Sequence, residues 1–157
     1  MILSKKTDFN IVKQYVEELG YELISKEYLN NAQKLILKDI TGYYYVIRWA
    51  DLLKGYKHRF VCKSNPYSIN NIKLFLYINN SNLTLLSEVY EGDEIDLKLF
   101  DNEGYFYSSP WCVLKGLKRN VFVAKFNKYS NQNIQLFLDK NNIDLKLVSD
   151  FKDSHSK

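Results

Sequence analysis

The sequence predicts an α+β protein of two tandem units, each a three-stranded antiparallel sheet plus a helix, preceded by an N-terminal capping helix. Three observations lead to this prediction. The sequence repeats itself at one constant offset, the one that separates Gly42 from Gly104. Each repeat opens with short alternating or β-branched segments separated by turn residues. Each repeat then closes with apolar residues at helical spacing.

The repeat holds one register over its whole length, which requires both units to share one fold. The matched segments are Gly42-Tyr43-x-Tyr45 with Gly104-Tyr105-x-Tyr107, Trp49 with Trp111, and Asn65-x-Tyr67-Ser68 with Asn127-x-Tyr129-Ser130. A third, partial copy runs from Asn10 to Ser25 and resembles Asn71 to Ser87, one residue shorter. We therefore expect an N-terminal helix over 1–20, repeat units over 21–82 and 83–151, and a flexible tail over 152–157.

Within the first unit, strands are expected over Tyr21–Ser25, Lys34–Asp39 and Tyr43–Trp49, and a further strand over His58–Lys63. Tyr21–Ser25 is interpreted as a linking strand, so the three strands of the sheet are the other three. Asp39 to Gly42 forms the turn between the second and third of these segments.

A helix is predicted to start near Ser68, which suits an N-cap, and to end at Asn79-Asn80. Ile69, Ile72, Phe75 and Leu76 form its apolar stripe. Asn65 and Asn127 precede the two helices, and we expect them to hold the preceding loops through side-chain-to-backbone hydrogen bonds.

Basic residues follow each tryptophan at the same place in the repeat. Such a cluster can contact backbone phosphates and gives salt-dependent affinity. The predicted nucleic-acid-binding residues are Arg48, Lys54, Lys57, Arg59 and Lys63 in the first unit, and Lys115, Lys118, Arg119, Lys125 and Lys128 in the second. The alternative is that these charges form only a solvated rim, and the formal net charge of +4 is modest.

Aromatic residues are interleaved with these charges. Tyr45, Trp49, Tyr107 and Trp111 could stack on bases if the sheet faces are exposed. The alternative is that they pack in the core, which we favour for the two tryptophans because they occupy matched positions in the repeat.

Acidic residues cluster in the second unit alone. Glu91, Asp93 and Glu94 are the candidates for contact with a basic protein surface, such as the nucleic-acid channel of a nuclease. A solubilising hairpin is the alternative. Carboxylates here also argue against simple wrapping of DNA by both units, because they repel phosphate.

The sequence offers little for catalysis, so no enzyme activity, metal or cofactor is expected. The two histidines, His58 and His155, are far apart, and Cys62 is replaced by Ala124 in the second unit. Neither a secretory signal nor an apolar stretch long enough for a membrane is evident. Two cysteines without a metal-binding spacing fit a reducing, cytoplasmic setting. The lack of a long apolar stretch predicts that the protein has no membrane partner.

The run G-Y-x-Y, W, L-x-x-G, F and N-x-Y-S-x-x-N-I-x-x-F-L resembles tandem repeats of phage and mobile-element proteins of Gram-positive bacteria. The resemblance extends from about Asp8 to Phe151. Such repeats often accompany homing-endonuclease-like domains or zinc knuckles, neither of which is present in this sequence. The βββα order, with a tryptophan on the second strand, is also similar to APETALA-type DNA-binding domains. Both resemblances imply nucleic-acid binding.

We therefore expect a non-catalytic nucleic-acid-binding protein, with double-stranded DNA as the first candidate ligand. The alternative is a phage-encoded inhibitor of a host defence nuclease, similar in role to anti-CRISPR proteins, that docks on a protein or ribonucleoprotein. The repeated basic segments favour the first hypothesis, and the acidic hairpin and modest net charge favour the second.

Overall fold

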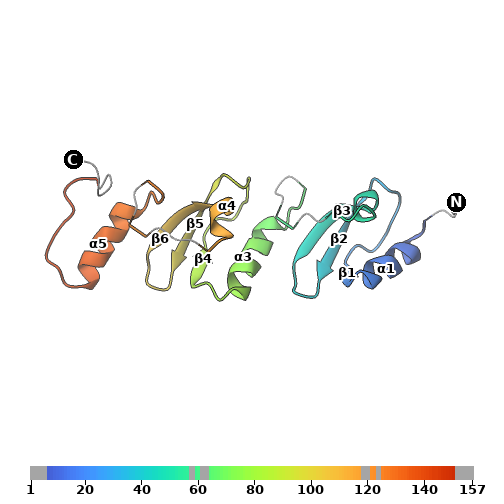
Figure 1. The fold of residues 1–157 in the computed structure, drawn as a ribbon, viewed down its shortest axis with the longest axis horizontal. Helices are drawn as coiled ribbons and strands as arrows, with labels where there is room; N and C mark the ends of the chain where they lie inside the picture. The colour runs from blue at the N-terminus through green and yellow to red at the C-terminus, as the bar shows by residue number, and fades with distance from the viewer. Residues whose placement is uncertain (1–6, 57–58, 61–63, 118–120, 123–124, 151–157) are drawn as a thin grey trace. The chain divides into compact units, whose positions relative to one another are not determined.

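The chain folds as an α+β protein with two three-stranded antiparallel sheets, each followed by a helix, and a helix at the N-terminus (Figure 1). A computed structural model describes residues 7–56, 59–60, 64–117, 121–122 and 125–150. Two compact units, Met1–Leu74 and Phe75–Lys157, divide the chain. The division falls inside helix α3 (Ser68–Ile78), so this one helix contributes residues to both units.

The first unit places its three strands in the order β1-β2-β3. Its elements are α1 (Phe9–Glu18), β1 (Tyr21–Leu23), β2 (Lys34–Asp39), β3 (Tyr44–Arg48) and the short helix α2 (Trp49–Leu52). The segment expected to link units is therefore the first strand of the sheet, because Leu23 pairs with Leu37 of β2.

The second unit repeats this order as β4-β5-β6. Its elements are β4 (Leu83–Leu85), β5 (Asp96–Asp101), β6 (Phe106–Pro110), α4 (Trp111–Leu114) and α5 (Ser130–Lys140). The registers match across the repeat: Leu37 pairs with Tyr45, and Leu99 pairs with Tyr107. The offset of the repeat in the sequence is thus also the offset of the strands.

The N-terminal helix corresponds to α3 in its pattern of burial. Val12 and Val16 are fully buried, and Ile72 and Leu76 are buried at the same spacing. Gly20 and Asn80 both adopt a positive φ directly after these helices. The partial copy is therefore two residues shorter than the later ones, not one, and its Asn10-Ile11 does not correspond to Asn71-Ile72.

Two expectations about the connection into α3 need correction. The strand expected over His58–Lys63 lies largely outside the described residues, and the two that are described, Arg59 and Phe60, form a bend. Ser68 is the first residue of α3 and not its N-cap, because its hydroxyl donates to the Asn65 carbonyl oxygen at 2.7 Å. The expectation for Asn65 is confirmed, since its Oδ1 accepts from the backbone N–H of Tyr67 at 3.0 Å.

Asparagine side chains also cover the open edge of β3. The N–H of Asp39 donates to the carbonyl oxygen of Tyr43, so the backbone groups of Tyr44 point away from β2. Asn71 accepts from the Tyr44 N–H at 2.9 Å and donates to its carbonyl oxygen at 2.7 Å. Asn65 donates to the same oxygen at 2.7 Å. This pair therefore satisfies an edge that a fourth strand would otherwise occupy.

In the second unit, two asparagines close the edge of β6 in the same way. Asn133 accepts from the Phe106 N–H at 2.8 Å and donates to the Phe106 carbonyl oxygen at 2.7 Å, and Asn127 donates to that oxygen at 2.8 Å. All four asparagines are at most 2% exposed. Within the described part of the chain, no helix is long and apolar enough to cross a membrane.

Because Asn71 closes the edge of β3, removal of its side-chain amide should greatly reduce the stability of the protein. Asn71→Ala should lower the free energy of unfolding by about 2–4 kcal/mol, because the part-buried Tyr44 N–H loses its acceptor and the buried Asn71 amide leaves a cavity. Urea denaturation measures this difference. The matched control is Asn70→Ala, which removes the neighbouring exposed amide and should leave the free energy of unfolding nearly unchanged. Equal effects of the two substitutions would contradict the closure.

Candidate nucleic-acid interface

The predicted basic residues lie mainly in two equivalent loops. Basic loop 1 covers residues 53–64 after α2, and basic loop 2 covers residues 115–128 after α4. Neither loop contains an aspartate or glutamate. Lys57, Lys63, Lys118 and Arg119 lie outside the described residues.

Four of the predicted lysines in these loops are described, and all four are exposed: Lys54, Lys115, Lys125 and Lys128. Lys125 and Lys128 each place Nζ 5.6 Å from the centroid of the next residue's ring, Phe126 and Tyr129. Among the ion pairs of the described residues, none involves any of the four. Their charges are therefore available to a ligand.

Arg48, by contrast, is already paired. It precedes α2, and its Nε lies 2.7 Å from Oδ2 of Asp51, three residues further on. The pair is exposed on the arginine side, where such contacts contribute about 0–1 kcal/mol. Arg48 could exchange this partner for a phosphate at small cost.

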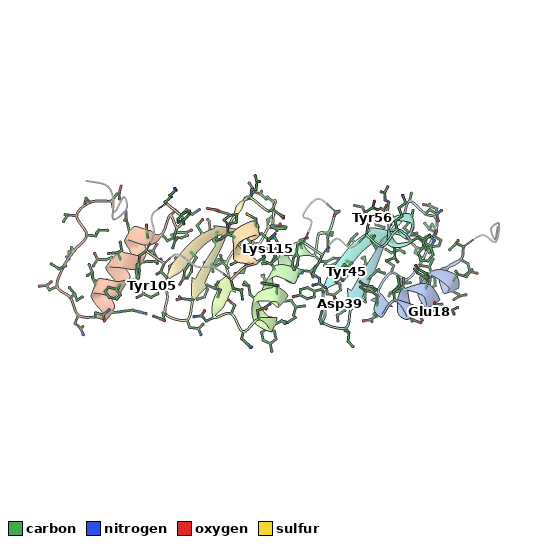
Figure 2. The ribbon with its side chains drawn as sticks, in the orientation of Figure 1. Glu18, Asp39, Tyr45, Tyr56, Tyr105 and Lys115 are labelled. Carbon is green, nitrogen blue, oxygen red and sulfur yellow. The ribbon has the colours of Figure 1, made fainter. Side chains whose placement is uncertain are left out.

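Arg59 is held by a cluster that joins β2, β3 and basic loop 1. Its Nη2 lies 3.2 Å from Oδ2 of Asp39 and donates to the Tyr45 hydroxyl at 2.6 Å. The Tyr45 hydroxyl donates in turn to Asp39 at 2.7 Å. The guanidinium carbon stands 4.1 Å from the centroid of the Tyr43 ring. Figure 2 shows Asp39 and Tyr45 side by side.

The cluster shifts the titration of its members. Burial alone would raise the pKa of Asp39, but hydrogen bonds from Thr41, Tyr45 and Tyr43 and the charge of Arg59 outweigh it and lower that pKa. Burial, followed by the hydrogen bond to Asp39, raises the pKa of Tyr45 to about 12. A phenol with this pKa stays protonated near neutral pH, so Tyr45 keeps the proton that it donates to Asp39 and the cluster stays joined as a clamp.

Among the residues that the structure describes, only those of the first unit form this clamp. Val121 occupies the position of Arg59 in the second unit. Asp101 keeps the rest of the arrangement, accepting from the Tyr105 N–H at 3.0 Å and from the Tyr107 hydroxyl at 2.6 Å. Lys140 of α5 instead stands 4.9 Å from the Tyr105 ring centroid. In the second unit, therefore, Lys140 stands over Tyr105 where Arg59 stands over Tyr43 in the first.

The predicted stacking residues are not on a surface. Tyr45, Trp49, Tyr107 and Trp111 are only 3–6% exposed, and Trp49 packs edge-on against Tyr15 at 5.2 Å between ring centroids. Buried rings leave no face for a base, so the stacking role is ruled out for all four residues. The core alternative, which the matched positions in the repeat favoured for the two tryptophans, also applies to Tyr45 and Tyr107.

Two of the exposed aromatics lie in the basic loops. Tyr56 is 52% exposed in basic loop 1, and Phe126 is 58% exposed in basic loop 2. Figure 2 labels Tyr56 in the loop that follows α2. The sequence did not reveal them through the repeat, because Tyr56 and Phe126 do not occupy matched positions. Their nearness in sequence to Lys54 and Lys125 is the feature that could have identified them as candidate contact residues.

The acidic candidates form a loop between β4 and β5. Glu91, Asp93 and Glu94 are exposed, and the Tyr90 hydroxyl donates to the Asp93 carboxylate. The Cys112 N–H donates to the Asp93 carbonyl oxygen at 3.0 Å, which fixes this loop against α4. Among the described residues, no group of three or more His, Cys, Asp or Glu side chains could hold a metal ion.

No protein-family model matches the chain, and neither the curated proteins nor the solved structures contain a match to it.

The clamp predicts a pH-dependent effect of Asp39→Asn. Above about pH 4 the substitution should lower the free energy of unfolding by about 2 kcal/mol. The reason is that Tyr45 and Arg59 then donate to a neutral amide instead of a charged carboxylate. The folded-state pKa of Asp39 is lowered, so its contribution is complete above the unfolded pKa and disappears as pH falls through the folded value. The two proteins should therefore converge in stability as the pH falls from about 4 toward 2.

Chemical denaturation between pH 2 and pH 8 measures this convergence. The matched control is Asp51→Asn, which breaks the exposed pair with Arg48 and should have almost no effect on the free energy of unfolding at any pH in this range. A pH-independent penalty for Asp39→Asn would refute the role of the carboxylate charge.

Proposed function

We propose that this protein is a non-catalytic nucleic-acid-binding protein that contacts phosphates through basic loops 1 and 2. The observation that carries the proposal is the recurrence of exposed lysines, without ion-pair partners among the described residues, in the same loop of both units. Double-stranded DNA is the first candidate ligand, since its two strands present a dense row of phosphates that exposed lysines neutralise without reading the base sequence.

The contact proposed here is mainly electrostatic. Lys54, Lys115, Lys125 and Lys128 would neutralise phosphates, and Tyr56 and Phe126 would supply rings in place of the buried ones. The resemblance to phage and mobile-element repeats supports the same class of ligand. The exposed free thiol of Cys112 is compatible with the reducing cytoplasm of a host cell, which we propose as the location.

A second candidate function is docking on a protein, and the acidic loop between β4 and β5 favours it. Glu91 and Glu94 lie there with the exposed apolar residues Val89 and Ile95, a combination that suits a basic protein surface with apolar contacts. An inhibitor of a host defence nuclease, comparable to an anti-CRISPR protein, would use such a loop against the enzyme or its ribonucleoprotein.

Salt dependence tests the first candidate. Fluorescence anisotropy with labelled duplex DNA, single-stranded DNA and RNA should show log affinity falling linearly with log salt. The double substitution Lys125→Gln and Lys128→Gln should reduce the slope by about 0.9 for each phosphate that is no longer neutralised. Lys26→Gln removes an exposed lysine outside the basic loops and serves as the control. Absence of binding even at low salt would refute the proposal.

Charge reversal in the acidic loop distinguishes nucleic-acid binding from docking on a protein, because it should strengthen the first interaction and abolish the second. Glu91→Lys with Glu94→Lys should strengthen binding to DNA about two- to tenfold, because the repulsion of phosphate is removed. If the protein instead docks on a basic protein surface, the same reversal should abolish the interaction with a purified nuclease and leave DNA affinity unaffected.

A further inference from the structure

The chain leaves α5 through the same turn that leaves α3. Asn79 donates from its side chain to the Phe75 carbonyl oxygen at 2.8 Å, and Asn141 donates to that of Phe137 at 2.8 Å. Asn80 and Asn142 then adopt φ values of 49° and 52°. In α3 this turn leads directly into strand β4.

The sequence after this turn also repeats the strand. Leu145-Lys146-Leu147-Val148-Ser149 matches Leu83-Thr84-Leu85-Leu86-Ser87 at the constant offset of the repeat. The serine has a fixed task in both sheets. Ser25 Oγ accepts from the Ile36 N–H at 2.8 Å, and Ser87 Oγ accepts from the Lys98 N–H at 2.8 Å. The serine thus receives a hydrogen bond from the second strand of its sheet.

Around α5 the apolar residues of this pattern lack the cover that their counterparts have. Leu83 and Leu85 are buried in β4, whereas Leu145 and Leu147 are 63% and 38% exposed. Phe75 packs edge-on against Trp111 at 5.2 Å between ring centroids, whereas its counterpart Phe137 packs edge-on against Phe122 at 5.8 Å and is still 42% exposed.

One edge of the segment is already satisfied, and the other is open. The Gln135 side chain accepts from the Leu147 N–H at 3.0 Å and donates to the Leu145 carbonyl oxygen at 3.4 Å. Backbone N–H groups of Lys146 and Val148 donate to no acceptor in the described part of the chain. Their counterpart Leu86 donates to the Lys98 carbonyl oxygen of β5 at 2.8 Å. The open edge is therefore the one that pairs in the complete sheet.

We propose that α5 and residues 145–149 form a docking site for a β-hairpin of another protein. The hairpin adds its strand antiparallel to Leu145–Ser149 and covers Phe137, as β5–β6 and Trp111 cover β4 and Phe75. Its paired strand carries large apolar side chains two residues apart, like Leu97 and Leu99, and donates a backbone N–H to Ser149 Oγ.

A second copy of this chain fits the site less well than a different protein does. Both of its hairpins are already paired, β2 with β1 and β5 with β4. Either could be offered only by releasing a buried strand, such as β4 with Leu83 and Leu85. A hairpin from a different protein carries no such cost.

The test uses the full 157-residue protein and, as probe, a fragment covering residues 94–142. The fragment contains β5, β6 and α5 but lacks β4, so the site should accept it as a model hairpin. In ¹⁵N-labelled protein, titration should give saturable shifts at Lys146–Ser149 with a micromolar dissociation constant. Leu147→Asp should weaken binding more than about 20-fold, and Ser149→Ala about fivefold.

Val148→Asp is the matched control, because Val148 is 96% exposed and its counterpart Leu86 remains 45% exposed in the complete sheet. It should leave the affinity within about twofold. Equal loss with Val148→Asp and Leu147→Asp, or no binding of the fragment at millimolar concentration, would overturn the proposal. A second experiment covers the case in which the fragment does not fold. In a tandem variant, residues 96–142 follow Lys157 in the same chain, and the added hairpin should protect the Lys146 amide from hydrogen exchange. Unprotected exchange at Lys146 in this variant would also overturn the proposal.

The mass of the protein alone, measured by light scattering from low to high micromolar concentration, distinguishes the source of the hairpin. A constant monomer mass is expected. A dimer that Leu147→Asp dissolves would overturn the assignment to another protein and identify a second copy as the occupant. Neither result depends on nucleic-acid binding, which uses basic loops 1 and 2.

Discussion

A three-stranded sheet has two open edges, and in each unit one of them is closed by side chains instead of a strand. Asn65 and Asn71 together satisfy the outward N–H and C=O of Tyr44. Their side chains also donate to the Arg59 carbonyl oxygen, at 3.2 and 2.7 Å. The start of α3, the edge of β3 and the middle of basic loop 1 are thereby joined at one point. Unpaired edges invite association, and an amide carries both the donor and the acceptor needed to close one.

This closure explains how two units with different surfaces keep one fold. Asn127 and Asn133 make the same bonds to Phe106 and Val121. Because the backbone of residue 59 or 121 is held, its side chain is free to vary, and arginine and valine occupy the two positions. The arginine adds a clamp to Asp39 in one unit, while the other unit gains an acidic loop. The two units thus differ in surface charge while they share the same sheet, helix and edge bonds.

The sequence predicted the repeat, the fold class and the part played by Asn65, because these depend on register and local turn chemistry. It did not reveal that Asn71 reaches the sheet edge, since that contact joins residues 27 positions apart. It favoured the core for Trp49 and Trp111 from their matched positions, but it left Tyr45 and Tyr107 open, because a tyrosine suits both core and surface. The short helices α2 and α4, of four residues each, are below the length at which periodicity is informative. The pairing of Arg59 with Asp39 likewise depends on tertiary structure.

Amide hydrogen exchange at Tyr44 and Phe106 tests the closure most directly. Both residues lie on edge strands, whose outward amides ordinarily exchange through small local openings. We expect these two amides to exchange as slowly as those at the centre of β2 and β5, with an opening free energy close to that of global unfolding. Rapid exchange at both positions, like that of solvent-exposed edge amides, would show that the asparagines do not close these edges.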